Sequence, residues 1–221
     1  MSTTSETIRN TWGPHQGEPV LATGAPLRRA RAAVIMLHGR GASAEDILNL
    51  ADEFAYEDIA YLAPQAAGHS WYPYSFLAPL EQNEPGLSSA LLAVAETRQR
   101  VEQAGLPAER TVLLGFSQGA CLALEFAVRN ARRYGGVVGL SGGLIGPDTT
   151  PRDYEGTFDG TPVILGCSDT DPHIPVARVH ETAEVFVRMG AAVTERIYPG
   201  LSHTVNQDEI QLVRKLLESI S

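Results

Sequence analysis

The chain has 221 residues, of which 43% are hydrophobic and 19% charged, so it can bury a full core and is expected to form a single domain over residues 1–221. Its formal net charge of -9 at pH 7 argues against nucleic acid and anionic membranes as partners, because both would repel it at long range. The two cysteines, Cys121 and Cys167, lie in no CxxC or CxxH spacing, so neither a disulfide framework nor a metal site is expected.

The N-terminal region carries no export or membrane signal. Residues 1–10 are polar, and no run in the chain approaches the roughly 18 apolar residues of a membrane span. We therefore expect a cytoplasmic protein without stable membrane insertion, in which residues 1–15 are extended or poorly ordered.

Short apolar runs alternate with longer segments of helical period along the rest of the chain. This pattern is typical of an α/β fold with a mostly parallel sheet covered by helices on both faces. The predicted strands span 32–37, 59–63, 111–115, 136–140, 162–167 and 192–198, and residues near 19–23 are a candidate antiparallel edge strand. The predicted helices span 43–54, 86–103, 118–131, 175–189 and 205–219.

Several of these helices carry boundary signals. Ser43 with Asp46 three residues later resembles a capping arrangement, Gly105 and Gly190 suit helix ends, and Pro175 suits a first turn. Two long segments escape the alternation. Residues 64–85 are rich in aromatic side chains, which predicts a loop packed over another part of the protein, whereas residues 142–160 are polar and consistent with solvated surface.

The hexapeptide Gly115-Phe116-Ser117-Gln118-Gly119-Ala120 joins a predicted strand to a predicted helix. A GxSxG in this context is typical of a nucleophile elbow, in which flanking glycines allow a strained turn that exposes the serine. The Gln118 N–H then lies at a helix N-terminus, where it can stabilise an oxyanion. Residues 139–143 repeat the pattern around Ser141, but the glycines and proline that follow allow no helix to begin there. Ser117 is therefore the predicted nucleophile.

A nucleophilic serine needs a base and an acid, which follow it in chain order in this architecture. The chain has six histidines: His15, His38, His69, His173, His180 and His203. Of the three after Ser117, His180 lies within a predicted helix and His173 is expected to line a loop, whereas His203 lies in a turn-rich loop after the last strand. His203 is the predicted base. The loop after the preceding strand offers two candidate acids, Asp169 and Asp171, and their spacing does not choose between them.

The segment Leu37-His38-Gly39-Arg40-Gly41 follows the first long apolar strand. Its glycines allow a sharp turn that directs the Arg40 N–H toward the space above Ser117, as a second oxyanion donor. The Arg40 side chain is either solvated surface or a contact for substrate. His38 is expected to order this loop by hydrogen bonding.

With HGRGAS, GFSQGA, SDTDPHIP and GLSH in this order, residues 30–221 resemble the carboxylesterase, lysophospholipase and acyl-protein thioesterase family of α/β-hydrolases. The resemblance implies an α/β-hydrolase fold and makes Asp171 the triad acid beside Ser117 and His203. It also aligns the family's aromatic pair with Trp71 and Tyr72. The chain departs from the family pattern at Arg40, at Ser43 and at Cys167-Ser168.

Together these features predict a serine carboxylic-ester hydrolase that works through an acyl-enzyme, without metal or cofactor. With a minimal lid, its substrate cleft is expected to involve Arg40, Trp71, Tyr72 and Ile174 and to favour small, soluble acyl esters. Thioesters and lysophospholipids are alternative substrates, and a binding protein of this fold without turnover is a further alternative. The oligomeric state, monomer or homodimer, stays open.

Overall fold

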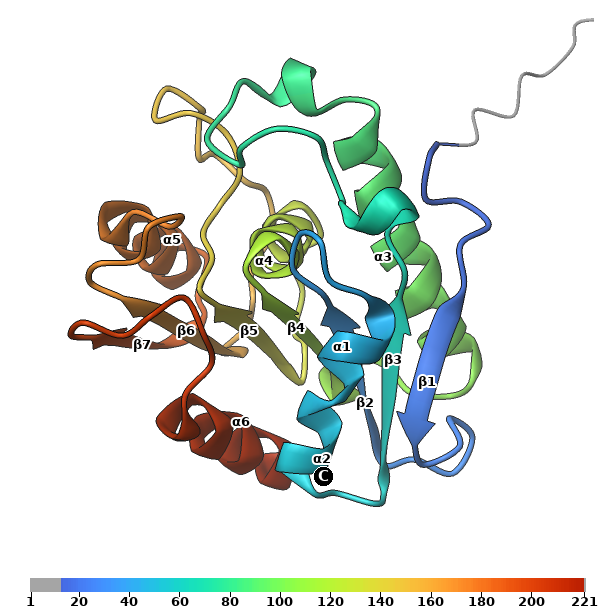
Figure 1. The fold of residues 1–221 in the computed structure, drawn as a ribbon. Coiled ribbons are helices and arrows are strands. Elements are labelled where there is room, and N and C mark those ends of the chain that lie inside the picture. The colour runs from blue at the N-terminus through green and yellow to red at the C-terminus, as the bar shows by residue number, and fades with distance from the viewer. Residues whose placement is uncertain (1–12, 221) are drawn as a thin grey trace, which may run out of the picture.

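A seven-stranded sheet lies at the centre of the protein, for which the computed structural model describes residues 13–220 (Figure 1). The strand order is β1-β3-β2-β4-β5-β6-β7. Strand β1 is antiparallel to β3 at one edge, and all other neighbours are parallel. The predicted mostly parallel sheet with an antiparallel edge is therefore confirmed. The strands are β1 (Val20–Gly24), β2 (Ala32–Leu37), β3 (Ile59–Pro64), β4 (Thr111–Phe116), β5 (Gly136–Leu140), β6 (Pro162–Ser168) and β7 (Ala192–Tyr198).

Helices cover both faces of the sheet (Figure 1). One face carries α3 (Gly86–Gln103), α4 (Gln118–Arg129) and α5 (Val176–Arg188); the other carries α1 (Ala44–Leu48), α2 (Leu50–Phe54) and α6 (Gln207–Ser219). Short 3₁₀ helices occupy Ala67–His69, Leu80–Asn83 and Ala108–Arg110. Among the described residues, no helix has the length and apolar character needed to cross a membrane.

Strand β2 shows how the sheet builds two cores at once. Ala33, Ile35 and Leu37 pack toward α3, α4 and α5, whereas Ala32, Val34 and Met36 pack toward α1, α2 and α6. All six are completely buried. Because successive side chains of a strand point to opposite faces, a strand covered on both sides is apolar at every position.

The predicted helix over residues 43–54 is two helices, α1 and α2. Its start is confirmed, since the Ser43 side chain accepts from the Asp46 N–H and the Asp46 carboxylate accepts from the Ser43 N–H. At Asn49 the backbone N–H bonds to the carbonyl of Asp46, three residues back. This tighter bond ends the regular α-helical pattern and begins a second short helix.

The other boundaries differ by two residues or fewer from the prediction. Strands β3, β4 and β6 each extend one residue further, and α4 ends two residues earlier, at Arg129. Pro175 lies just before α5 rather than within it. Helix α6 begins two residues late because Asn206 caps it: its side chain accepts from the Glu209 N–H.

Gly105 and Gly190 follow α3 and α5 with φ of 97° and 81°, the left-handed conformation that glycine adopts at helix ends.

The segment over residues 142–160 is not a simply solvated loop. Leu144 and Ile145 are completely buried, as is Phe158 near its end. The buried Arg178 side chain of α5 donates to the carbonyls of Leu144 and Gly146. Its apolar positions were too few to reveal this packing by periodicity.

Most of the N-terminal segment expected to be extended, residues 1–15, lies outside the described residues. His15 is described and is packed into the protein: it is 4% exposed. Its ring donates from Nε2 to the carbonyl of Trp71 and accepts at Nδ1 from the Ala67 N–H. At this position, the expectation of poor order does not hold.

Candidate active site

Ser117 stands between β4 and α4 in a conformation that few residues other than glycine adopt, with φ 55° and ψ -120°. The elbow closes tightly around it. A Cβ on Gly115 would lie 2.2 Å from the backbone oxygen of Gly119, and one on Gly119 would lie 2.1 Å from the backbone oxygen of Leu37. Only glycine fits at both positions, which explains the sequence spacing physically.

A chain of hydrogen bonds runs from Ser117 through His203 to Asp171. His203 Nε2 lies 2.8 Å from Ser117 Oγ, and His203 Nδ1 lies 2.7 Å from Asp171 Oδ2. With the carboxylate accepting at Nδ1, the imidazole carries its proton there and leaves Nε2 free to accept from the serine hydroxyl. The structure thus brings together three residues that are spread over 86 positions of the chain.

Asp171 and Asp169 have separate partners. The Oδ1 atom of Asp171 accepts from the N–H groups of His173 and Ile174, at 2.8 and 3.0 Å. Burial raises the pKa of Asp171, but the hydrogen bonds from His203 and from these two N–H groups outweigh it and bring the pKa below its ordinary value. Asp169 instead accepts from the Gly200 N–H at 2.8 Å, so it binds a loop rather than the imidazole.

The loop that carries His203 is held on several sides. Asp169 binds its start, and the Glu209 carboxylate accepts from the Asn206 N–H at its end. The ring of His203 packs against Phe116, with centroids 5.0 Å apart. His173 meets it edge-on at 4.9 Å, so His173 lines the site beside the candidate base.

Two backbone N–H groups near the serine have no partners of their own. Within residues 13–220, neither the Arg40 N–H nor the Gln118 N–H has a hydrogen-bond acceptor. Gly39 lets its loop approach Ser117 closely, since a Cβ at Gly39 would lie 3.4 Å from Ser117 Cβ. Free N–H groups beside a nucleophile are suited to binding a developing oxyanion.

A cleft of about 630 Å³ opens over Ser117. The residues that line it come from five segments: the loop around Gly39, the aromatic loop (residues 64–85), the elbow at Ser117, and the loops that carry Asp171 and His203. They are Gly39, Arg40, Ala42, Tyr72, Pro73, Tyr74, Ser75, Phe76, Phe116, Ser117, Gln118, Cys121, His173, Ile174 and His203.

Three of the four residues predicted to contact substrate line this cleft: Arg40, Tyr72 and Ile174. Trp71 does not. It is completely buried, and its indole donates to the carbonyl of His38. Trp71 therefore supports the Gly39 loop without lining the cleft. The indole needs a buried acceptor, and His38 supplies one.

The Arg40 side chain lies across the aromatic loop. Its guanidinium donates to Ser70 Oγ and to the carbonyls of Pro73 and Tyr74, at 2.9, 2.9 and 2.6 Å. It also lies over the ring of Tyr72, 5.9 Å from the centroid. The guanidinium is therefore a wall of the cleft and a clamp between two loops.

Sequence patterns did not reveal the role of the Gln118 side chain. Its Oε1 accepts from the Trp71 N–H and its Nε2 donates to the carbonyl of Tyr72. Gln118, the predicted oxyanion donor, thus also ties the aromatic loop to the elbow through its side chain.

His38 orders its loop as expected. It is completely buried, its Nδ1 donates to the Gly39 carbonyl, and its Nε2 accepts from the Ala66 N–H. Because Nε2 accepts a hydrogen bond, it carries no proton and the ring is neutral; burial favours this form by lowering the pKa of His38.

Ser141 and His180, the alternatives weighed in the sequence, lie in different surroundings. Ser141 is only 2% exposed and no helix follows it, whereas Ser117 lines the cleft. His180 is exposed on α5 and pairs with Glu195. Over residues 13–220, no group of three or more His, Cys, Asp or Glu side chains is arranged to hold a metal ion.

Comparison with known proteins identifies the family of the chain. Residues 19–221 match the phospholipase/carboxylesterase family model. The chain belongs to this family. Phospholipase/carboxylesterase enzymes are hydrolases of carboxylic esters, and the fold and the serine-hydrolase class predicted from the motifs are thereby confirmed.

Three proteins that are similar to this chain match it over nearly its whole length. The crystal structure of a phospholipase/carboxylesterase from Dyadobacter fermentans has 47% identity and a TM-score of 0.88, covering 91% of this chain and 97% of that one. The structure of esterase PE8 has 25% identity and a TM-score of 0.74, covering 92% and 98%. Acyl-protein thioesterase 1 of Saccharomyces cerevisiae is 25% identical over 225 residues, 90% of this chain and 99% of the yeast protein.

Proposed function

We propose that the protein hydrolyses small carboxylic esters through a Ser117-His203-Asp171 triad and an acyl-enzyme intermediate. The observation that carries the proposal is the continuous chain of contacts at 2.8 and 2.7 Å from the Ser117 hydroxyl to the Asp171 carboxylate. These distances are within the hydrogen-bonding range that proton transfer requires.

In the proposed reaction, His203 takes the Ser117 proton as Oγ attacks the ester carbonyl, and Asp171 holds the imidazole in the required tautomer and stabilises its charged form. The carbonyl oxygen, now an oxyanion, accepts from the N–H groups of Arg40 and Gln118. His203 gives its proton to the leaving alcohol. It then activates a water molecule, which attacks the acyl-enzyme and releases the carboxylic acid and Ser117.

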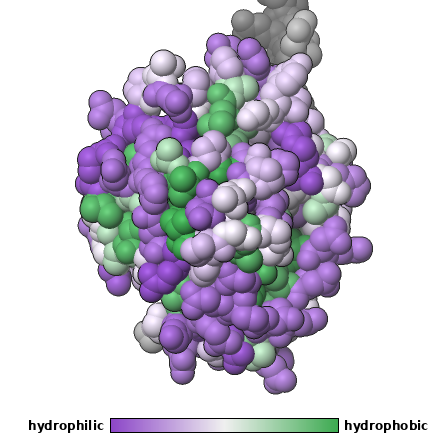
Figure 2. All heavy atoms as spheres, turned by 60° about the vertical axis from the view of Figure 1, so that its left-hand side comes forward, coloured by the Kyte–Doolittle hydropathy of each residue, from purple (hydrophilic) through white to green (hydrophobic). Residues whose placement is uncertain are grey.

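Substrate preference follows from the shape and polarity of the cleft. Its walls are loops, and Tyr74, which lines it, is 58% exposed. On the face shown in Figure 2, hydrophobic residues form small groups between hydrophilic ones rather than one broad apolar surface. A long acyl chain would leave much of its length in water, so we propose that short acyl groups are preferred.

Thioesters are the second candidate, because the yeast relative is an acyl-protein thioesterase. The same triad and oxyanion donors serve both ester classes, since the leaving thiol needs less help from a protonated imidazole than an alcohol does. Cytoplasmic location and the lack of nucleic-acid partners remain predictions.

A labelling experiment tests the triad. The wild-type protein should react with a fluorophosphonate probe and hydrolyse p-nitrophenyl acetate with continuing turnover after any burst, and Ser117→Ala should do neither. Ser141→Ala is the matched control, since it removes the hydroxyl from the other GxSxG, and it should keep both properties. Loss of labelling in Ser141→Ala, with Ser117→Ala unaffected, would refute the proposal.

A second experiment tests the substrate class. Rates for p-nitrophenyl esters should fall as the acyl chain grows from acetyl to palmitoyl, and a parallel series of thioesters with the same acyl groups measures the choice between oxygen and sulfur. Activity that peaks at the longest chains would contradict the preference for small substrates.

A further inference from the structure

The charges that line the cleft over Ser117 are of one sign. Among the described residues, the lining includes no Asp or Glu, but it includes three side chains that can carry a positive charge, those of Arg40, His173 and His203. Asp171, which binds His203, has a completely buried side chain and does not line the cleft. The cleft thus differs from the chain as a whole, whose net charge is -9.

Arg40 brings a permanent charge to the cleft, because a guanidinium stays protonated in proteins. Within residues 13–220 it forms no ion pair. By contrast, Arg31, Arg129 and Arg178 each bind a carboxylate. Arg40 is exposed and lines the cleft, so an anion in the cleft can reach its unpaired charge.

The Arg40 guanidinium is held in place but keeps free donors. Both hydrogens of Nη1 are used, by Ser70 Oγ and the Pro73 carbonyl, and one hydrogen of Nη2 binds the Tyr74 carbonyl. Of the five N–H donors of a guanidinium, the Nε–H and the second hydrogen of Nη2 have no acceptor among the described residues. A planar group that is already held loses little freedom on binding, and a carboxylate has two oxygens to accept from it.

Hydrogen bonds connect the guanidinium to the elbow. Ser70 Oγ accepts from Arg40 Nη1 at 2.9 Å and from Gln118 Nε2 at 3.3 Å, so a single hydroxyl separates the guanidinium from the Gln118 side chain. Gln118 follows Ser117 directly in the chain, and all three residues, Arg40, Ser117 and Gln118, line the same cleft. A small ester bound at Ser117 can therefore place a charged end at Arg40.

We propose that the Arg40 guanidinium binds a carboxylate of the substrate, so that the enzyme prefers small esters that carry a carboxylate over neutral esters of the same shape. This inference rests on the proposed function and specifies its substrate class. The net negative charge of the protein opposes an anionic ester only weakly, because salt screens exposed charges beyond about 10 Å at 0.1 M. Since Arg40 is itself exposed, the expected preference is moderate, about 5- to 10-fold.

The test compares each carboxylate ester with the neutral amide of the same size. Methyl half-esters of succinic, glutaric and adipic acid, paired with the methyl esters of succinamic, glutaramic and adipamic acid, carry the charge on the acyl group. Acetoxyacetate and β-acetoxypropanoate, paired with their amides, carry it on the alcohol. Titration at constant pH gives kcat/KM, and the carboxylate-to-amide ratio should fall about 5-fold or more in Arg40→Gln for at least one pair. Equal ratios in wild type and Arg40→Gln for every pair overturn the inference.

Arg31→Gln is the matched control, because Arg31 also joins distant segments but lies away from the cleft; it should leave every ratio unchanged. Arg40→Gln also loses its bonds to the aromatic loop, which affects both esters of a pair and cancels in the ratio.

Salt separates the local charge from the charge of the whole protein. In wild type the ratio should fall as NaCl rises from about 0.02 to 0.5 M, since salt screens an exposed ion pair, and in Arg40→Gln it should not fall. A wild-type ratio that stays constant or rises with salt overturns the inference, and this measurement needs no variant to fold.

The outcomes separate the two proposals. Hydrolysis that depends on Ser117 but shows the same ratios in wild type and Arg40→Gln overturns the binding of a carboxylate by Arg40 alone. Hydrolysis that persists in Ser117→Ala overturns the proposed triad, and the inference with it.

Discussion

At the scale of single residues, Asp169 and Asp171 differ in what surrounds them rather than in type. Both follow β6, and chain position alone left them equivalent as candidate acids. In the fold, Asp171 receives the His203 ring and two backbone N–H groups, whereas Asp169 receives the Gly200 N–H. The first arrangement orients an imidazole, and the second ties down a loop.

Asp171→Asn tests this difference. If the new amide donates to Nδ1, the imidazole is held in the tautomer whose Nε2 carries the proton and cannot accept from Ser117. We expect kcat to fall by about 10³- to 10⁴-fold, measured with p-nitrophenyl acetate. Asp169→Asn is the control and should lose less than about 10-fold. Equal losses in the two variants would show that neither carboxylate acts specifically on His203.

At the scale of elements, the approach of α4 to β2 positions Ser117 against the Arg40 loop. Gly119, in the first turn of α4, touches the carbonyl of Leu37 at the end of β2. A side chain there would force the helix away from the strand end. The elbow and the candidate oxyanion donors therefore depend on one close contact between backbones.

Gly119→Ala should lower the free energy of unfolding by about 3 kcal/mol, because its Cβ would lie 2.1 Å from a backbone oxygen that has little room to move. Urea denaturation measures the loss. Gly105→Ala is the control: Gly105 has φ 97° but nothing within 4 Å of the added Cβ, so only the backbone penalty of about 1 kcal/mol applies. Losses of the same size would contradict the steric explanation.

Helix α6 begins with a buried carboxyl group behind the His203 loop. Glu209 is 1% exposed and its Oε2 accepts from the Asn206 N–H, while Oε1 has no partner among the described residues. Burial raises the pKa of Glu209 to about 7, although the Asn206 hydrogen bond opposes this. Between its ordinary value of 4.5 and 7, the folded protein keeps a proton that the unfolded chain has released.

Glu209 therefore weakens the folded state as pH rises through this window, and the penalty is fully present above pH 7. In Glu209→Gln, the free energy of unfolding relative to wild type should rise by up to about 3 kcal/mol between pH 4.5 and 7.5. Any loss of cap geometry adds an offset that does not vary with pH. Chemical denaturation across this pH range measures the change, and Glu218→Gln, at an exposed position, is the control. If the free energy of unfolding varied with pH in the same way in wild type and Glu209→Gln, the predicted role of Glu209 would be wrong.

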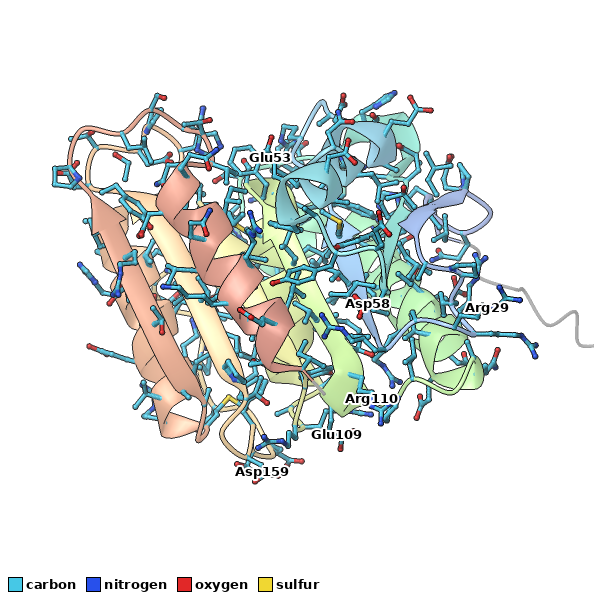
Figure 3. The ribbon with its side chains drawn as sticks, turned by 90° about the horizontal axis from the view of Figure 1, so that it is seen from below. Arg29, Glu53, Asp58, Glu109, Arg110 and Asp159 are labelled. Carbon is cyan, nitrogen blue, oxygen red and sulfur yellow. The ribbon has the colours of Figure 1, made fainter. Side chains whose placement is uncertain are left out.

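At the scale of the whole molecule, the cleft is assembled from segments that are far apart in the chain. They follow the carboxyl ends of the parallel strands β2, β3, β4, β6 and β7, where α/β folds place their ligands. Charged residues such as Glu109, Arg110 and Asp159 lie at the opposite ends of the strands, near the starts of β4 and β6 (Figure 3). The Arg40 side chain joins the Gly39 loop to the aromatic loop.

Arg40→Lys keeps the charge and the backbone N–H but loses the planar group that reaches three oxygens at once. The aromatic wall of the cleft should loosen, raising KM for short esters about 5-fold, with kcat changed less. Arg31→Lys is the control, because Arg31 also joins distant segments, Asp58 and the carbonyls of Leu217 and Ile220, but away from the cleft. It should affect stability without changing KM. A raised KM in Arg31→Lys alone would contradict the role of Arg40.

Sequence patterns anticipated the strands and most helix ends closely, because alternation, glycine and proline act within a few residues. They missed the break at Asn49, the cap at Asn206 and the burial of residues 142–146, since each depends on a specific hydrogen bond or on contact with α5. Trp71 was grouped with the cleft because aromatic composition does not distinguish a ring that faces substrate from one that supports a loop.

The sequence alone determined the α/β architecture, the elbow at Ser117 and the order of acid and base candidates, because these follow from periodicity and from the steric demands of a short turn. Tertiary structure decided the partners: Asp171 beside His203, the Arg40 side chain on the aromatic loop, and Tyr72 rather than Trp71 at the wall of the cleft. A side chain's partners depend on segments that only the folded sheet brings together, so periodicity and turn chemistry do not specify them.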